Sequence, residues 1–570
     1  MYMSEVRNLI LAVVASVAIM LGWKYIYGEF FAVKTVPEGV QESESLIPEV
    51  DDIVDYASYS DALKQVPRVE LKNSKLAASV SLRGALIDDA SLVKYRVSLD
   101  KNSENVLLMS PEGTVSDSMV EFGWVDPKHV LKVPGRDTVW ALEDGSDEQN
   151  FTIRWDNGEG LIFRLKFSVD QDYMLTVAQE VINNTDVNVH LAHYGRINRA
   201  HSKSSKSFWI SHEGAIGSFG HGLKEWTYKN LEEAGSIRLS GVTREDGGRS
   251  WIGFADKYWF TALIPSASEQ GKLAFRTQRV YREGASRFQV DYSKSHGTIG
   301  AHDKVEAVTH LFMGAKELEL LDQYKDTLNI PMFDKAVDFG MLYFITKPVF
   351  LLLQYFHKLL GNFGLAIVML TVAIKLVAFP LSMRSYVSMF KLKRLQPEVL
   401  RIKELYKTDD LRISKEIASL FKKHKVSPLS GFLPVLIQIP IFFALYKVLF
   451  VTIEMRHAPL FGWIRDLSSQ DTANFLNLFG LIPLEPPFCI GVLPVVLGLT
   501  MVLQQKVMQK DQATPDRYGV MKFLPYIFVF VFSSFPSGLV LYWICSNVIT
   551  ILQQIVIRYF VCRKELGANG

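Results

Sequence analysis

The chain has 570 residues and a formal net charge of +2, from 62 lysine and arginine residues against 60 acidic residues. This length allows two or more domains, and the balanced charge argues against a protein that binds nucleic acid through a general basic excess. The three cysteines, Cys489, Cys545 and Cys562, lie beyond residue 488, so disulfides do not hold the long polar region before them and zinc is not expected.

The N-terminal segment, residues 1–28, is predicted to be a transmembrane anchor. Residues 9–26 are apolar, and Trp23, Tyr25 and Tyr27 supply an aromatic belt at the far edge. A cleaved signal peptide is the alternative. The apolar run is long for a signal peptide and its aromatic end lacks the small residues of a cleavage site, which favours an uncleaved anchor.

Residues 29–67 are predicted to form a flexible linker, because they combine low hydrophobicity with high charge. The acidic residues of this linker are Glu38, Glu42, Glu44, Glu49, Asp51, Asp52 and Asp55.

From residue 68 to residue 318 apolar and polar residues alternate in short segments. Residues 161–169 place Phe163, Leu165, Phe167 and Val169 on one face, as expected of a half-buried strand. Similar segments occur around 76–86, 173–181, 251–263 and 288–292, and turn signals at 156–158, 183–184 and 246–248 separate them. This pattern predicts a large all-β sandwich without long helices.

Residues 319–361 connect this domain to the rest of the chain. Within them, residues 349–360 are apolar but too few to cross a bilayer, so they are predicted to lie as an interfacial helix on the outer leaflet.

Residues 362–570 contain five apolar runs, which with the anchor give six predicted transmembrane helices. The runs are residues 364–381, 429–451, 488–503, 520–535 and 537–559. The run at 520–535 is short for a hydrocarbon core of about 30 Å, so the bilayer is expected to thin there. Prolines at 380, 434 and 440 are expected to kink or end their helices.

The charges of the loops predict the orientation. Residues 384–428 carry twelve lysines and arginines against five acids, and residues 506–522 carry four against two. Residues 453–487 hold two basic residues against four acids. The positive-inside rule therefore places both termini in the cytoplasm and the β domain outside it.

Lys375 stands inside the apolar run 364–381. A lysine near the middle of a span costs about 2.5–3.5 kcal/mol on insertion scales, so it is kept where it faces water, a counter-charge or a polar cavity. Snorkelling of a lysine near the helix end to the membrane surface is the alternative.

Other polar residues also lie within the predicted spans. They are Thr371, one turn before Lys375, and Gln438, Gln504, Gln505, Ser546, Asn547, Thr550, Gln553 and Gln554. Hydrogen bonding between helices explains each of them singly. Together, with a lysine that has no acidic partner in the membrane, they indicate a water-filled groove.

The basic segment 384–428 is predicted to form a cytoplasmic helical hairpin. Apolar residues recur at three- and four-residue spacing on both sides of a break at 408–410, and Pro428 ends the pattern. Its basic residues include Lys391, Lys393, Arg394, Arg401 and Lys403. Two interpretations stand: a topology signal with a solvated surface, or a docking arm for acidic partners or RNA.

Several stretches resemble the YidC/Oxa/Alb family of membrane-protein insertases, in the Gram-negative form with a large periplasmic domain. They are residues 338–348, 364–428, 434–440 (Pro-Val-Leu-Ile-Gln-Ile-Pro), 456–459, 463–467 and 535–542 (Phe-Pro-Ser-Gly-Leu-Val-Leu-Tyr). The resemblance is dense over residues 338–560, while the β domain matches in size and position.

This resemblance implies a multi-pass inner-membrane protein with a periplasmic supersandwich and a hydrophilic groove open to the cytoplasm. Lys375 falls where the family usually has a groove arginine, and Thr371 and Trp543 fall on substrate-contact positions. Lysine keeps the charge but loses the planar fork of arginine. The short tail after residue 559 lacks the basic extension that some relatives use on ribosomes, so ribosome contact would rest on 384–428 and 506–522.

The leading hypothesis is therefore an insertase and chaperone of inner-membrane proteins that is not an enzyme and needs no cofactor, since the chain has no Gly-rich phosphate loop. The expected partners are nascent inner-membrane proteins, the Sec translocon and its accessory proteins, the ribosome and membrane lipid. A secondary transporter using Lys375 is one alternative, although no internal repeat of broken helices is present. A sugar enzyme using His193, His201 or His212 is another.

Overall fold

The computed structural model describes residues 59–100, 102–114, 117–200, 211–219, 222–242, 248–266, 273–282, 285–340, 342–407, 409–426, 433–471, 473, 490–509 and 520–566. The predicted N-terminal anchor, most of the predicted linker, and His201 lie outside these residues. The end of the linker is not extended: α2 (Tyr59–Lys64) is a short helix, because Ala62 is buried and the Tyr59 hydroxyl donates a hydrogen bond to Asp89.

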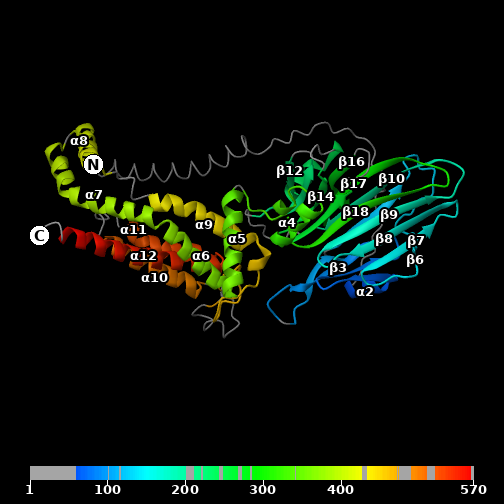
Figure 1. Ribbon diagram of the computed structural model, residues 1–570, viewed down its shortest axis with the longest axis horizontal. Coiled ribbons are helices and arrows are strands. Elements are labelled where there is room, and N and C mark those ends of the chain that lie inside the picture. Colours follow the sequence, from blue (N-terminus) through cyan, green and yellow to red (C-terminus); the bar gives the residue numbers. More distant parts are fainter. Residues whose placement is uncertain are drawn as a thin grey trace.

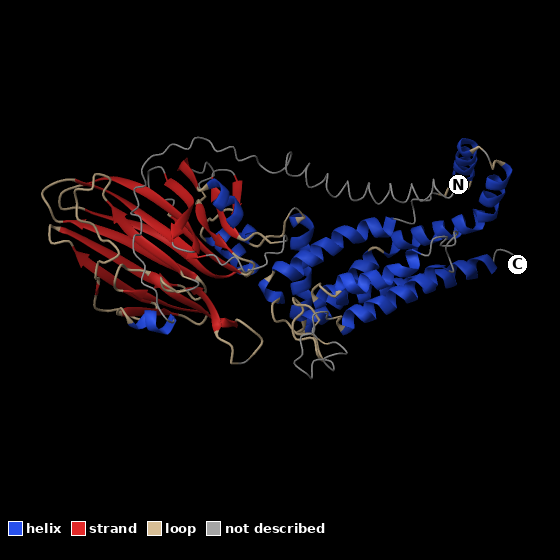
Figure 2. Ribbon diagram, turned by 180° about the vertical axis from the view of Figure 1, so that it is seen from behind, coloured by secondary structure: helices blue, strands red, loops and turns tan. Residues whose placement is uncertain are grey.

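The β domain consists of two nine-stranded antiparallel sheets (Figure 2). The first has the order β1-β2-β3-β5-β10-β17-β16-β13, with β4 on β3. Its strands are β1 (Arg68–Lys72), β2 (Leu76–Ser81), β3 (Ile87–Arg96), β4 (Asn105–Met109), β5 (Ser118–Val125), β10 (Val189–Ala200), β13 (Ser236–Val242), β16 (Leu273–Arg282) and β17 (Ala285–Ile299).

The second sheet has the order β12-β11-β14-β15-β18-β9-β8-β7-β6. Its strands are β6 (Ala141–Leu142), β7 (Asn150–Asp156), β8 (Leu161–Val169), β9 (Met174–Asn183), β11 (Gly214–Phe219), β12 (Gly222–Thr227), β14 (Trp251–Ala255), β15 (Trp259–Pro265) and β18 (Lys304–Ala315). The final strand, β18, lies inside this sheet, between β15 and β9.

Aromatic side chains fill the space between the sheets and confirm the predicted sandwich. The rings of Phe219 and Phe275, one from each sheet, are 4.9 Å apart, and Tyr292 and Thr309 join the sheets through their hydroxyls. In β8 the odd-numbered residues are buried, as the alternation predicted. The predicted segment 251–263 is two strands, because the Asp256 N–H donates to the Trp259 carbonyl in a turn.

The C-terminal half is helical, and its main helices run side by side away from the β domain (Figure 1). One short helix, α3 (Tyr228–Ala234), lies between β12 and β13 in the β domain. The helices that follow β18 are α4 (Leu318–Thr327), η2 (Phe333–Ala336), α5 (Tyr343–Leu360), α6 (Phe363–Val377), α7 (Phe379–Leu405), α8 (Asp410–Lys423), α9 (Leu433–Val451), η4 (Ile453–Met455), α10 (Val492–Gln509), α11 (Val520–Phe532) and α12 (Ser537–Leu566).

Helix α5 crosses the others at the end of the bundle that faces the β domain (Figure 1). This placement suits the predicted interfacial helix, but α5 begins six residues earlier than predicted, at Tyr343 rather than at residue 349. Pro348 lies beyond the first turn of α5, so its missing N–H leaves the Phe344 carbonyl without its usual donor in the helix.

One helix of the described residues, Ser537–Phe560, is long and apolar enough to cross a membrane. Helices α6 and α7 form a second candidate span that is bent by 59°. The bend lies beside Pro380, as predicted. The other apolar segments are shorter: Gln438–Val451, Val492–Val507 and Phe523–Phe532. Six spans therefore remain a prediction.

Helices α7 and α8 form the helical hairpin, at the end of the bundle far from the β domain (Figure 1). Its first arm is not a separate helix starting near residue 384. It is continuous with the segment that follows the bend, because Pro380 occupies the first turn of α7, where its missing N–H costs no hydrogen bond. Asp409 caps α8 by accepting from the Arg412 N–H at 3.0 Å.

Candidate functional site

Lys375 lies in the last turn of α6, where three helices meet. Its Nζ donates to the Gln438 side-chain oxygen on α9 and to the Thr550 hydroxyl on α12, at 3.1 Å each. No ion pair recorded between described residues includes Lys375. The lysine therefore has two polar partners, both neutral, which leave its charge in place.

The polar groups of α12 extend this cluster along one side of the helix. Thr550 donates to the Ser546 carbonyl at 2.7 Å, and Gln553 donates to the Lys375 carbonyl at 3.0 Å. The Gln438 amide donates to the Tyr542 hydroxyl. Residues 542, 546 and 550 are spaced four apart, so they lie on one face of α12. That spacing is the signal by which Tyr542, which was not among the predicted site residues, could have been found.

Two predicted groove residues form their hydrogen bonds with groups other than Lys375. Thr371 is fully buried, and its hydroxyl donates to the Ile367 carbonyl of its own helix at 2.7 Å. The Asn547 amide donates to the Thr500 hydroxyl on α10 at 3.1 Å. Neither forms a hydrogen bond with Lys375 in the described part of the chain, and both side chains are buried.

Trp543 belongs to an aromatic cluster rather than to the polar one. Its ring centroid lies 5.0 Å from Phe442 on α9, and 4.9 Å and 6.0 Å from Phe532 and Phe528 on α11. Trp543 precedes Thr550 by two turns of α12, or about 10 Å along the axis. The aromatic cluster therefore lies about two turns of α12 away from the contact between Lys375 and Thr550, and beside Tyr542.

The predicted basic residues of the hairpin all lie on α7. Lys391, Arg394, Arg401 and Lys403 are exposed and Lys393 is partly buried. Their positive charges are therefore spread over a solvated surface at the far end of the bundle.

The β domain and the bundle make direct polar contacts. Lys447 Nζ on α9 lies 3.0 Å from a carboxylate oxygen of Asp338, in the segment before α5. Arg456 donates to the carbonyls of Arg96 and Val97, in the β3–β4 hairpin, at 2.7 and 3.0 Å. These contacts tie the C-terminal end of α9 to the segment before α5, and the residue after η4 to the β domain.

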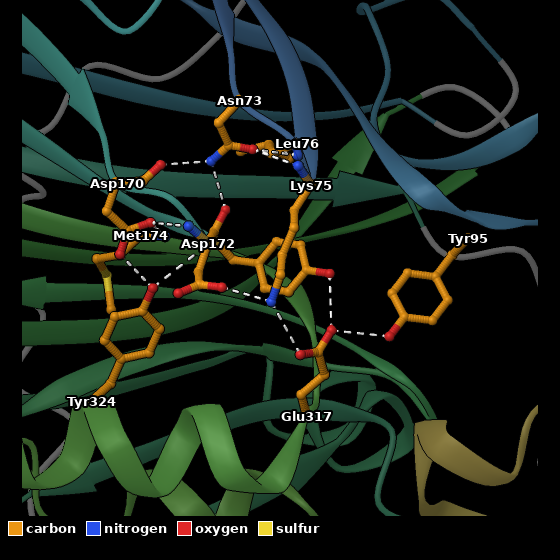
Figure 3. Close-up of polar contacts among 10 residues, drawn as sticks. Asn73, Lys75, Leu76, Tyr95, Asp170, Asp172, Met174, Glu317 and Tyr324 are labelled. Atoms are coloured by element: carbon orange, nitrogen blue, oxygen red, sulfur yellow. Dashed lines mark hydrogen bonds and ion pairs between the residues drawn. The ribbon is translucent and has the colours of Figure 1, made fainter. Parts of the chain in front are cut away.

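Glu317, at the start of α4, is the centre of a second polar cluster at this junction (Figure 3). Its carboxylate accepts from the hydroxyls of Tyr95 and Tyr173 at 3.0 Å each and from Lys75 at 3.3 Å. Lys75 also pairs with Asp172 at 2.6 Å. The cluster joins the first strands of the β domain to the start of α4.

Glu454, in η4, approaches the same corner from the bundle. Burial and the nearby carboxylate of Glu317 raise the pKa of Glu454 to about 8, although the Leu318 N–H at the start of α4 partly stabilises its anion. One of its carboxylate oxygens is buried without a hydrogen-bond partner.

The histidines of the β domain form no catalytic constellation in the described residues. The His193 ring is buried 5.7 Å from both Trp124 and Tyr292. The His212 ring bonds the Ala215 carbonyl at 3.0 Å, and burial lowers the pKa of His212 to about 4. No group of three or more metal-ligating side chains occurs among the residues that the structure covers.

Comparisons with known proteins match both halves of the chain to known families. Residues 68–352 match the family described as the YidC periplasmic domain, and residues 355–564 match the 60Kd inner membrane protein family. The membrane protein insertase YidC of Rickettsia akari (strain Hartford) is 40% identical over 571 residues, covering 98% of this chain and 100% of the relative. That of Rickettsia typhi (strain ATCC VR-144 / Wilmington) is 40% identical over 568 residues, with the same coverage.

Among solved structures, an active YidC insertase crystal structure covers 85% of this chain and 91% of its own, with 16% identity and a TM-score of 0.35. A galactose mutarotase related enzyme from Lactobacillus acidophilus covers 43% of this chain and 97% of its own, with 8% identity and a TM-score of 0.31. Given 40% identity over nearly its whole length, the chain belongs to the YidC family of membrane protein insertases, inner-membrane proteins that carry a periplasmic domain.

Proposed function

We propose that this chain inserts proteins into the inner membrane by offering the polar flank of an incoming segment a hydrated, positively charged surface around Lys375. The observation that carries this proposal is the pairing of Lys375 with two neutral oxygens, from Gln438 and Thr550. Because no carboxylate among the described residues pairs with Lys375, the ammonium charge remains available to an acidic segment of a substrate.

The proposed mechanism needs no nucleotide, cofactor or enzymatic step. Apolar substrate helices gain free energy by moving into lipid, so only their polar flanks meet a barrier. The cluster around Lys375 lowers that barrier by replacing hydration. Helix α11 has 13 residues, about 20 Å at 1.5 Å per residue, against a core of about 30 Å. Local thinning of the bilayer beside it would shorten the path further.

The proposed topology has six spans with both termini in the cytoplasm. The excess of lysine and arginine in residues 384–428 and 506–522 supports it. The hairpin of α7 and α8 is then cytoplasmic, and its exposed cations offer a surface to the ribosome or to the Sec machinery. The Sec translocon, its accessory proteins, nascent inner-membrane proteins and lipid are the proposed partners.

A secondary transporter is not supported, because the relatives at 40% identity are named membrane protein insertases.

Site-specific photocrosslinking tests the proposed groove. A photoreactive residue at position 438 or 550 flanks Lys375 and leaves it intact, and should crosslink to stalled nascent membrane proteins. Position 552 on α12 is the matched control, because Leu552 is 57% exposed on the outside of the bundle. Equal crosslinking from 552 and from the two groove positions would contradict the proposal.

A further inference from the structure

A groove of about 500 Å³ lies where α7 leaves the bend and the chain returns from α8. Its apolar lining includes Met383, Val387 and Val426, and three cations, Arg384, Lys391 and Lys425, surround it. The groove is therefore amphipathic.

The three cations converge from two segments. Arg384 and Lys391 are seven residues apart on α7, with Val387 between them, so they lie on one face two turns apart. Lys425 follows α8 and has a φ of +52°, a left-handed conformation that a residue with a Cβ rarely adopts. Hydrogen bonds from the Lys425 and Val426 N–H groups to Lys422 and Phe421 hold this turn and bring Lys425 to α7.

Among the residues that the structure describes, no acidic side chain balances the positive charge of the groove. No acidic residue lines it, and none of its three cations forms an ion pair with another described residue. Three like charges gathered without a counter-ion favour an anionic ligand.

The position of the groove relative to the apolar surface indicates what kind of anion it binds. Leu376 and Val377, at the end of α6, are 65% and 84% exposed, and Met383 is 41% exposed. In an inner-membrane protein these side chains face acyl chains, so the cations just beyond them lie at the level of the lipid headgroups. A soluble anion or a nucleic acid would gain nothing from the apolar lining.

We propose that this groove binds an anionic phospholipid of the cytoplasmic leaflet. Arg384, Lys391 and Lys425 hold its phosphate, and Met383, Val387 and Val426 contact the upper part of an acyl chain. Basic pockets between helices on the cytoplasmic side are established lipid sites in other membrane proteins. The choice of leaflet rests on the proposed topology.

Lipid binding to the full-length chain in detergent tests the proposal without any insertion assay. Native mass spectrometry measures retained phosphatidylglycerol and phosphatidylcholine with the same acyl chains, and we expect retention to favour phosphatidylglycerol. Lys425→Gly removes one cation and also suits the positive φ, so it should fold and weaken phosphatidylglycerol binding about fivefold.

The triple variant Arg384→Gln, Lys391→Gln, Lys425→Gln should abolish the preference. The control triple Arg401→Gln, Lys403→Gln, Lys407→Gln removes the same charge from the end of α7 and the turn after it, outside the groove, and should keep the preference. Equal losses in both triples, equal binding of the two lipids, or displacement of phosphatidylglycerol by glycerol phosphate or an oligonucleotide would overturn the proposal. Because the readout is bound lipid, failure of the insertion mechanism would leave this result unchanged.

Discussion

The ammonium nitrogen of Lys375 lies 3.1 Å from the amide oxygen of Gln438, so a charge on α6 is held by a neutral group on α9. A carboxylate in the place of Gln438 would satisfy the same geometry but would cancel the charge. The neutral partner fixes the position of the ammonium group and preserves its field.

Substitutions of Lys375 should distinguish the effect of its charge on insertion from the effect of its packing on stability. Lys375→Arg should retain function, whereas Lys375→Ala and Lys375→Leu should lose it for some substrates. Lys375→Glu should be worst for substrates with acidic tails, because attraction becomes repulsion. Lys375→Leu should hold or raise stability, by about 2 kcal/mol or more, since it removes an intramembrane charge. Complementation of a depletion strain, with membrane levels measured, checks this; full activity of the Glu variant would remove support for the charge mechanism.

Removal of residues 392–424 should impair insertion of co-translationally delivered substrates without unfolding the bundle. The deleted part of the hairpin contributes little buried surface: among the described residues of 392–424, only Leu395 and Ile413 are buried. Crosslinking of ribosome-bound chains and thermal unfolding in detergent would measure the two effects. Wild-type insertion at equal protein level would show that the hairpin serves topology alone.

A cysteine at Ser414 should report which side of the membrane the hairpin occupies. Ser414 is exposed on α8, and its hydroxyl makes a single local bond to the Asp410 carbonyl at 3.0 Å, so Ser414→Cys is structurally mild. A membrane-impermeant maleimide should label it after permeabilisation and not in intact cells. Labelling from outside intact cells would reverse the proposed orientation.

Protonation of Glu454 should stabilise the junction between the β domain and the bundle. Because burial raises the folded-state pKa to about 8 from an ordinary 4.5, the stabilisation is complete below pH 4.5 and is lost as pH rises through 8. Glu454→Gln should therefore be more stable than the parent at pH 8.5 by at most a few kcal/mol, with a smaller gain at pH 5. Thermal unfolding in detergent at both pH values checks this, and parallel pH profiles would contradict it.

The ion pair of Lys447 and Asp338 should couple the two parts of the chain energetically. Both side chains are about one-fifth exposed, so we expect a coupling energy of about 1 kcal/mol in a double-mutant cycle. Lys447→Met and Asp338→Asn, singly and together, would be compared by thermal unfolding. Strictly additive effects would show that the contact adds nothing to the attachment.

The fold was more predictable from the sequence than the contacts of the site. The alternation in β8 repeats every second residue and identifies a strand locally, whereas the turn that divides β14 from β15 is only three residues long and carries no glycine or proline. Lys375 stood out because a charge in an apolar run is costly in any arrangement.

The hydrogen-bond partners of Lys375 could not be predicted from the local sequence pattern. Gln438 and Thr550 are 63 and 175 residues away, and only the packing of three helices brings them together. Thr371 and Asn547 are polar residues of the same helices, yet their hydrogen bonds go to the Ile367 carbonyl and the Thr500 hydroxyl. Helical spacing predicts which residues share a face, but not which neighbour that face meets.

The place of β18 in the second sheet has a consequence for the order of biosynthesis. Residues 304–315 are the last strand to be made, yet they fill the gap between β15 and β9. Until they arrive, those two strands expose unpaired edges, which favour pairing with other chains. The domain therefore completes its second sheet only after nearly all of it has been synthesised and exported, immediately before the helices of the bundle emerge.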